Sequence, residues 1–295
     1  MIENIKRIGS ILFILFLCKY SLLGKVNFSL KFTDYDGVGF KAARNAWMRD
    51  VAQEAMEIIG GIIKQDGHVN IEIKSNLNIP CAVSHGKKWR IEPENLNQKM
   101  ILEAHHRITH QNTQDDGKIH GQIEFNTNRF SKNNQCILRR TIIHELTHLL
   151  GFIPWKMEHN RYLSYNDYDK LLHDGNGNFF LIGKEKLSIN PKFDYSSGLY
   201  AYGNNIKCFN NGRSVKIYCP KKYEGGSSFA HLDAKAHPLS IMNPCGNPQD
   251  YPIWNKWELG IMQDLGYQIN WEQYNLYVDK LNAQNKQIYK VKESF

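Results

Sequence analysis

Hydrophobic residues recur at helical spacing in three segments of the chain. The longest runs from Lys41 to Ile63, and its apolar positions are Ala42, Ala46, Val51, Ala55, Ile58, Ile59 and Ile62. A second apolar face begins at Cys136 and ends at Leu150, just before Gly151, a residue type that commonly ends helices at positive φ. A third segment, Trp254 to Leu265, precedes Gly266. The pattern therefore predicts two long helices and a shorter one near the C-terminus.

Shorter stretches alternate between apolar and polar residues, as half-buried strands do. Val69 to Ile73 and Gly121 to Asn126 show this alternation, and Cys81 to Val83 is a shorter candidate. Residues 152–226 are rich in Asn, Gly, Tyr and Lys, which favours short strands and loops. We predict an α+β fold with an N-terminal subdomain of a twisted sheet and two long helices (25–151). A looser C-terminal subdomain (152–270) and a charged tail (271–295) follow.

The first residues have the pattern of an export signal. Lys6 and Arg7 precede an apolar run from Ile8 to Cys18 that is shorter than the roughly 20 residues a membrane helix needs. We expect residues 1–24 to be a cleaved signal peptide, and the protein to be secreted or periplasmic with no stable membrane insertion afterwards. An uncleaved anchor and a lipoprotein modified at Cys18 are the alternatives.

Charge adds little to this picture. The formal net charge of +8 falls to +6 with the leader, which carries three basic residues and one acidic residue. The remaining Lys and Arg residues are scattered along the chain instead of clustered with aromatic residues. This distribution argues against a nucleic-acid partner.

Five cysteines remain after the predicted leader: Cys81, Cys136, Cys208, Cys219 and Cys245. Export makes disulfides possible. Cys208 and Cys219 flank a predicted hairpin with Asn211-Gly212 at its turn, so we expect these two to be bridged. Five buried thiols are the alternative.

The second helix carries the sequence His144-Glu145-Leu146-Thr147-His148. Two histidines four residues apart project from one helical face and can bind one zinc ion, and Glu145 is placed to act as general base towards a water molecule. A catalytic zinc takes three protein ligands and leaves one position open. The motif predicts a zinc hydrolase, against the alternative of two surface histidines on a structural helix.

A third ligand has to come from elsewhere in the chain. The extended metzincin pattern places it three residues after the glycine that follows the motif, and here that position is Pro154. The downstream candidates are His159, His173, His231, His237, Glu158, Asp167 and Asp169.

Three further segments resemble the leishmanolysin family of zinc metallopeptidases, a metzincin family in which a long insertion delivers the third histidine. Gly225 to Leu232 is similar to the Gly-Ser-rich approach to that histidine. Ser240-Ile241-Met242-Asn243-Pro244 is similar to its Met-turn, and Gln263 to Tyr267 to the end of its C-terminal helix. The resemblance extends from about Gln122 to Tyr267.

This resemblance implies a zincin-like fold with one catalytic Zn²⁺ bound by His144, His148 and His231. It also implies that Glu145 is catalytic and that Met242 forms an apolar floor beneath the metal without binding it. His237 is the second choice for the third ligand.

The strand at Gly121 to Asn126 is expected to be an edge strand beside the zinc. An extended substrate could then pair with Gly121, Ile123 and Phe125 through main-chain hydrogen bonds. We predict a secreted zinc metalloendopeptidase that cleaves internal bonds of protein or peptide substrates in a cleft between the subdomains. The alternatives are a non-catalytic zinc-binding secreted protein, and a metzincin-like peptidase with a different third ligand.

Overall fold

The fold is α+β, and its main sheet has four strands. The computed structural model describes residues 24–87, 89–94, 97–155, 164–183, 187–244 and 253–284, so the predicted signal peptide lies almost wholly outside the described residues. The strands are β1 (Val26–Phe32), β2 (Gly67–Ser75), β3 (Ala82–Gly86) and β6 (Gly121–Phe125). Their order is β1-β2-β6-β3, with β3 antiparallel to β6 and the other pairs parallel.

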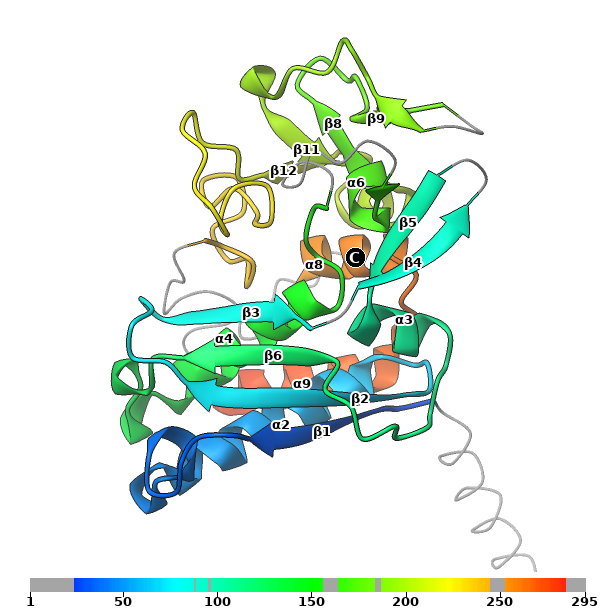
Figure 1. The fold of residues 1–295 in the computed structure, drawn as a ribbon. Helices are drawn as coiled ribbons and strands as arrows, with labels where there is room; N and C mark the ends of the chain where they lie inside the picture. The colour runs from blue at the N-terminus through cyan, green and yellow to red at the C-terminus, as the bar shows by residue number, and fades with distance from the viewer. Residues whose placement is uncertain are drawn as a thin grey trace, which may run out of the picture.

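Two long helices lie against one face of this sheet, as Figure 1 shows. They are α2 (Ala46–Ile62) and α4 (Gln135–Leu149), which confirms the two helices predicted from apolar spacing. Two short 3-10 turns, η1 (Gly39–Lys41) and η2 (Ala43–Asn45), precede α2, so this helix begins later than expected. The core includes many fully buried aliphatic side chains, among them Ile59, Ile71, Ile123, Leu138 and Ile142.

A hairpin and a short helix connect the sheet to the rest of the molecule. Strands β4 (Trp89–Glu94) and β5 (Asn97–Leu102) form the hairpin, β5 leads directly into α3 (Glu103–Thr109), and β5 also pairs with β7 (Ser164–Tyr165). Residues 127–129 and 132–134 form the 3-10 turns η3 and η4 before α4.

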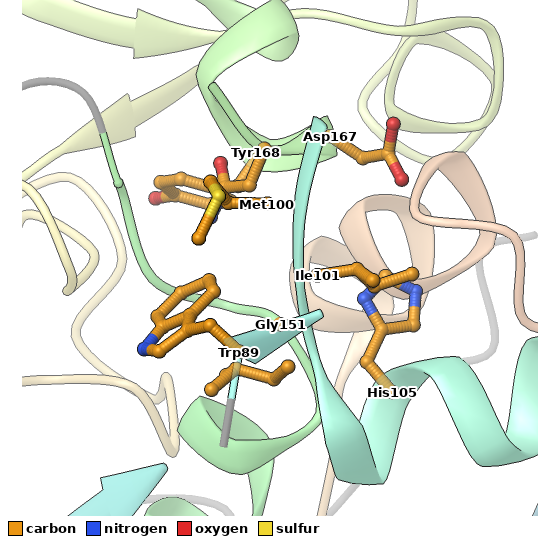
Figure 2. Close-up of a pocket in the computed structure, with 9 residues that line it drawn as sticks. Trp89, Met100, Ile101, His105, Gly151, Asp167 and Tyr168 are labelled. Atoms are coloured by element: carbon orange, nitrogen blue, oxygen red, sulfur yellow. The ribbon is translucent and has the colours of Figure 1, made fainter. Parts of the chain in front are cut away.

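The hairpin lies beside the end of α4 at a junction drawn in Figure 2, which is lined by Trp89 of β4, His105 of α3 and Gly151, two residues after α4. Gly151 has φ +100, and a Cβ atom there would lie 2.6 Å from Nδ1 of His105. Only glycine meets both conditions without strain. The predicted helix end at Gly151 is therefore confirmed, and the chain turns there towards Phe152.

Short elements make up most of residues 164–217, as the composition indicated. The helices are α6 (Asp167–Leu171) and α7 (Asn204–Phe209), with a 3-10 turn η5 (Tyr195–Ser197). A three-stranded sheet has the order β12-β11-β8, built from β8 (Leu172–Asp174), β11 (Leu199–Ala201) and β12 (Val215–Ile217). Strands β9 (Leu181–Ile182) and β10 (Ser188–Ile189) form a separate pair.

Two further helices follow, of which the first packs against α7 and the second against α2. The predicted C-terminal helix is α8 (Lys256–Asp264), with Gly266 at φ +99 after its end. The segment expected to be a charged tail instead forms α9 (Trp271–Gln284), which buries Tyr274, Val278 and Leu281. Residues 285–295 of that segment lie outside the described residues.

The predicted Cys208–Cys219 bridge is wrong, because both residues are free thiols. The turn at Asn211-Gly212 exists, with φ of 53° and 77°, but it joins helix α7 to strand β12 instead of joining two strands. Cys208 lies on the helix, and Cys219 lies beyond the strand, where its Sγ donates to the carbonyl of Tyr195 at 3.6 Å. Cys81 and Cys136 are also free, and Cys245 lies outside the described residues.

Within the described ranges, none of the helices combines the length and the hydrophobicity that a bilayer crossing requires.

Candidate metal centre

Helix α4 carries the first two histidines of the site. His144 and His148 are one turn apart, and both side chains are buried. Between them, Thr147 faces the core, where its hydroxyl accepts a hydrogen bond from the indole of Trp254 at 2.8 Å. This contact fixes the rotation of the last turn of α4 against the segment that leads into α8.

His231 comes from the chain after β12. Its backbone carbonyl accepts from Tyr218 N at 2.8 Å, and Leu232 forms a bridge with Ile217, so the segment runs alongside the β12 strand. Phe229, two residues before His231, has φ +69, an uncommon conformation for a bulky residue. This local strain lies two residues from a buried histidine, and strained backbone is common at functional sites.

The structure brings these three histidines together at their Nε2 atoms. Nε2 of His231 lies 3.1 Å from Nε2 of His144 and 3.3 Å from Nε2 of His148. Among the described residues, this trio is one of two groups whose ligand atoms lie close enough to share a metal ion. The two histidines predicted from helical spacing, His144 and His148, therefore lie next to His231, the third ligand expected from the resemblance.

The other ring nitrogen of each histidine is held by the main chain. Each Nδ1 donates to a carbonyl oxygen, and the acceptors are those of Ile241 for His144, Phe152 for His148 and Ser227 for His231, at 2.7, 2.9 and 2.8 Å. A neutral imidazole has a single ring hydrogen, so each Nε2 keeps its lone pair.

Burial lowers the pKa of all three imidazoles: to about 4 for His148, to about 3 for His231, and well below the ordinary value for His144. At neutral pH the three imidazole rings are therefore uncharged, and the lone pairs of their Nε2 atoms point towards one shared position. Two ligands of a tetrahedral ion, each bound at about 2.0–2.1 Å, lie about 3.3–3.4 Å apart. The donor set and its spacing fit a divalent transition-metal ion.

Glu145 lies beside this centre and is buried. Burial raises the pKa of Glu145 to about 7, while hydrogen bonds from the hydroxyl and amide of Ser84 act in the opposite direction. A carboxyl group with a pKa near neutrality can both accept and return a proton.

A cavity of about 680 Å³ opens beside the histidines and Glu145. One wall is the edge strand β3 with Ala82, Val83 and Ser84. The opposite wall contains Tyr223, Ser227 and Asn243. In Figure 1, β3 forms the border of the main sheet, facing the segment coloured yellow.

The expected role of Gly121, Ile123 and Phe125 as an edge strand is wrong. Strand β6 lies between β2 and β3, so both of its sides are already paired, and all five of its residues are buried. The sheet has edge strands β1 and β3, and β3, the neighbour of β6, is the one that lines the cavity. Any main-chain pairing with a ligand in the cavity would therefore use β3.

The segment Ser240 to Met242 lies beside the histidine trio and helps to hold His144 in place. Met242 is fully buried, its amide donates to Oγ of Ser240 at 2.9 Å, and its carbonyl accepts from Leu232 N at 2.8 Å. Its neighbour Ile241 provides the acceptor for His144. This segment therefore links the two parts of the histidine trio.

The other candidates for the third ligand are engaged elsewhere. Nε2 of His237 accepts from Lys216 N at 3.0 Å, and its ring packs on Trp257 at 4.5 Å. His173 contacts Ser214, Asp167 pairs with Lys99, and Asp169 caps α6. Glu158 and His159 lie outside the described residues.

Ser84, Cys81 and Arg140 were not identified from the sequence, although all three line the cavity. For Arg140 the spacing contained the information, because it lies one helical turn before His144 and so on the same face of α4. Ser84 and Cys81 could be found only after the order of the strands was known.

Comparison of the whole chain with protein-family models and with curated proteins finds no match.

Proposed function

We propose that this protein is a zinc-dependent metalloendopeptidase. The observation that carries the proposal is the convergence of three neutral histidine Nε2 atoms beside a buried glutamate at the wall of an open cavity. Three imidazole ligands with an open side are typical of catalytic metal centres, whereas structural zinc sites are usually closed by four protein ligands.

His144, His148 and His231 would hold the ion through Nε2. When bound, zinc supplies Lewis-acid activation of water and of a carbonyl group. The three main-chain acceptors keep the rings in the orientation and tautomer that binding requires, and such partners commonly matter for metal affinity.

Glu145 is the proposed general base. Its carboxylate takes a proton from the attacking water and returns it to the leaving amine, and Ser84 orients the carboxylate from the neighbouring strand. A pure binding protein would have no need of a buried acid at this position.

Strand β3 is the proposed substrate platform. Its outer side faces the cavity, so an extended peptide can add to the sheet there by main-chain hydrogen bonds. Five consecutive residues, Pro80 to Ser84, line the cavity, which suits an extended chain that continues on both sides of the scissile bond. We therefore favour cleavage at internal positions.

The metzincin-like and leishmanolysin-like assignment belongs to this proposal. It is supported by the late position of His231 in the chain, by positive φ at Gly151 after the zinc helix, and by the buried Met242 next to the acceptor of His144. Export by an N-terminal signal is likewise proposed, because the first residues have the required charge and apolar pattern.

The test is hydrolysis of a peptide library by the full chain as purified, after zinc removal with a chelator, and after zinc is restored. We expect loss and recovery of cleavage, with products cut at internal bonds by mass spectrometry. A protein that binds one zinc at the trio and cleaves nothing would be a non-catalytic zinc-binding protein.

The third ligand has its own test. His231→Ala should lose cleavage and the zinc ion bound at the trio, whereas His237→Ala should keep that ion, because His237 contacts Lys216 and Trp257 instead. Full zinc content in His231→Ala would contradict the assignment.

A further inference from the structure

A second group of metal-binding side chains lies away from the cavity, where the β4–β5 hairpin meets α3. Glu92 comes from β4, His106 from α3, and His110 is the residue that caps the end of α3. One ligand atom from each lies within 4.8 Å of the others. None of these residues takes part in the proposed peptidase site.

The two histidines present their rings as a pair. They are one helical turn apart, with centroids 4.1 Å apart and ring planes at 13°. Nδ1 of His110 lies 3.1 Å from the carbonyl of His106, so its hydrogen is directed there and its Nε2 keeps a lone pair. Nδ1 of His106 is buried and has no hydrogen-bond partner within the described part of the chain, so stacking holds this ring.

Both Nε2 atoms face the same carboxylate oxygen. Oε1 of Glu92 lies 3.3 Å from Nε2 of His106 and 3.5 Å from Nε2 of His110. These distances exceed the roughly 2.7–3.2 Å of direct N–H···O bonds. They are close to the separation of about 3.3–3.4 Å expected for two ligands on one tetrahedral ion.

The neighbouring lysine contacts the other oxygen of Glu92, not the Oε1 atom that the two histidines face. Lys99 approaches the other oxygen, Oε2, at 3.6 Å, but lies closer to Asp167, at 2.9 Å. The site is open to solvent, since the side chain of His110 is 50% exposed. An ion can therefore enter without rearrangement of the fold.

We propose that Glu92, His106 and His110 form a second, non-catalytic metal site that binds a divalent transition-metal ion and ties β4 to the end of α3. Two imidazoles and one carboxylate favour zinc, nickel or copper over magnesium or calcium. Because the hairpin packs on the junction at Gly151, an ion here would stabilise the connection between the sheet and the chain after α4.

Zinc stoichiometry tests this directly. The full chain is stripped with a chelator and dialysed against a small excess of zinc, and bound zinc is measured by elemental analysis. We expect two zinc ions for wild type, one for His110→Gln and one for His231→Ala. None is expected for the double variant.

His85→Gln is the matched control, because His85 is also 50% exposed and faces a single carboxylate, Oε1 of Glu124 at 3.8 Å, without a second histidine. It should keep both ions. The zinc retained at the trio shows that His110→Gln is folded. In His231→Ala, added zinc should raise the Tm, and His110→Gln should abolish that shift.

A wild type that binds a single zinc ion, lost in His231→Ala, would overturn the second site and leave the proposed function standing. Two ions in His110→Gln would also overturn it. The converse result, one ion lost only in His110→Gln, would support the second site and remove the metal from the proposed peptidase centre.

Discussion

Nδ1 of His144 donates a hydrogen bond to the main-chain carbonyl of Ile241 at 2.7 Å. This contact joins the helix that carries two of the proposed ligands to a segment almost a hundred residues later. That segment is in turn held by Glu258 of α8, whose Oε1 accepts from the hydroxyl of Ser240 at 2.5 Å. Glu258 therefore positions a proposed zinc ligand without touching the metal.

Glu258→Ala should weaken zinc binding at the trio by up to about 10-fold, the lower end of the cost of losing a direct partner of a metal ligand, because Glu258 acts on His144 only through the Ser240–Met242 segment. The dissociation constant is measured by competition with a chelator. Glu258→Gln keeps a carbonyl acceptor for Ser240 and should recover part of the affinity. Glu272→Ala, a change at an exposed position on α9, is the control. Unchanged affinity in Glu258→Ala would show that the turn is held without it.

Ser84→Ala should lower kcat with little change in KM or zinc content. Ser84 hydrogen-bonds to Glu145, and a misplaced catalytic group can cost up to about 100-fold in rate. Steady-state kinetics on one peptide measures the effect, and Ser84→Thr, which keeps the hydroxyl, should restore most of the rate. A rise in KM alone would mean that Ser84 acts on substrate binding instead.

The spacing of apolar residues identified α2, α4 and α8, because each helix buries one continuous stripe. It also predicted the end of α4 at Gly151, where the backbone and His105 both exclude a side chain. The His144–His148 pair followed from the geometry of one helix. Its third partner required the resemblance in the segments around His231 and Met242, because ordinary spacing rules do not reach across a long insertion.

Alternation along β6 was misleading about its place in the sheet. In a half-buried strand, Gln122 and Glu124 would face solvent. Both are buried instead, and the side-chain amide of Gln122 donates to the carboxylate of Glu124 at 2.6 Å. Lys74 also pairs with Glu124, at 3.0 Å. Polar side chains that satisfy one another can occupy an interior strand, so a two-residue period indicates a strand but not an edge.

The charged C-terminal segment contained a helical stripe that its overall composition concealed. Tyr274, Val278 and Leu281 are spaced four and three residues apart and are buried, while Glu272 and Asp279 are exposed. The average composition of a segment hides such an apolar face, whereas the spacing of its apolar residues reveals the face.

His105→Gln should make the protein less sensitive to acid. Burial lowers the pKa of His105 from 6.5 to about 4, so between these values the unfolded chain binds more protons than the folded one. Stability is fully present above pH 6.5 and is lost as the pH falls towards 4, by about 3 kcal/mol from this residue. Glutamine can still donate to the carbonyl of Leu265, the present partner of His105 at 3.0 Å.

The measurement is urea unfolding of wild type and His105→Gln at pH 7 and pH 4. The difference in unfolding free energy between the two pH values should be smaller in the variant. The half-exposed His85 provides the control, and His85→Gln should behave like wild type. An equal loss in all three proteins would show that His105 does not contribute to acid sensitivity.

The most direct test of the central claim is the cleavage of casein by wild type and by Glu145→Gln at equal, measured zinc content. Glutamine keeps the size of the side chain but cannot take up a proton, so cleavage should fall by at least about 100-fold while zinc remains bound. Wild-type cleavage in Glu145→Gln, or no cleavage by zinc-loaded wild type, would contradict the proposal of a metallopeptidase that uses Glu145 as its general base.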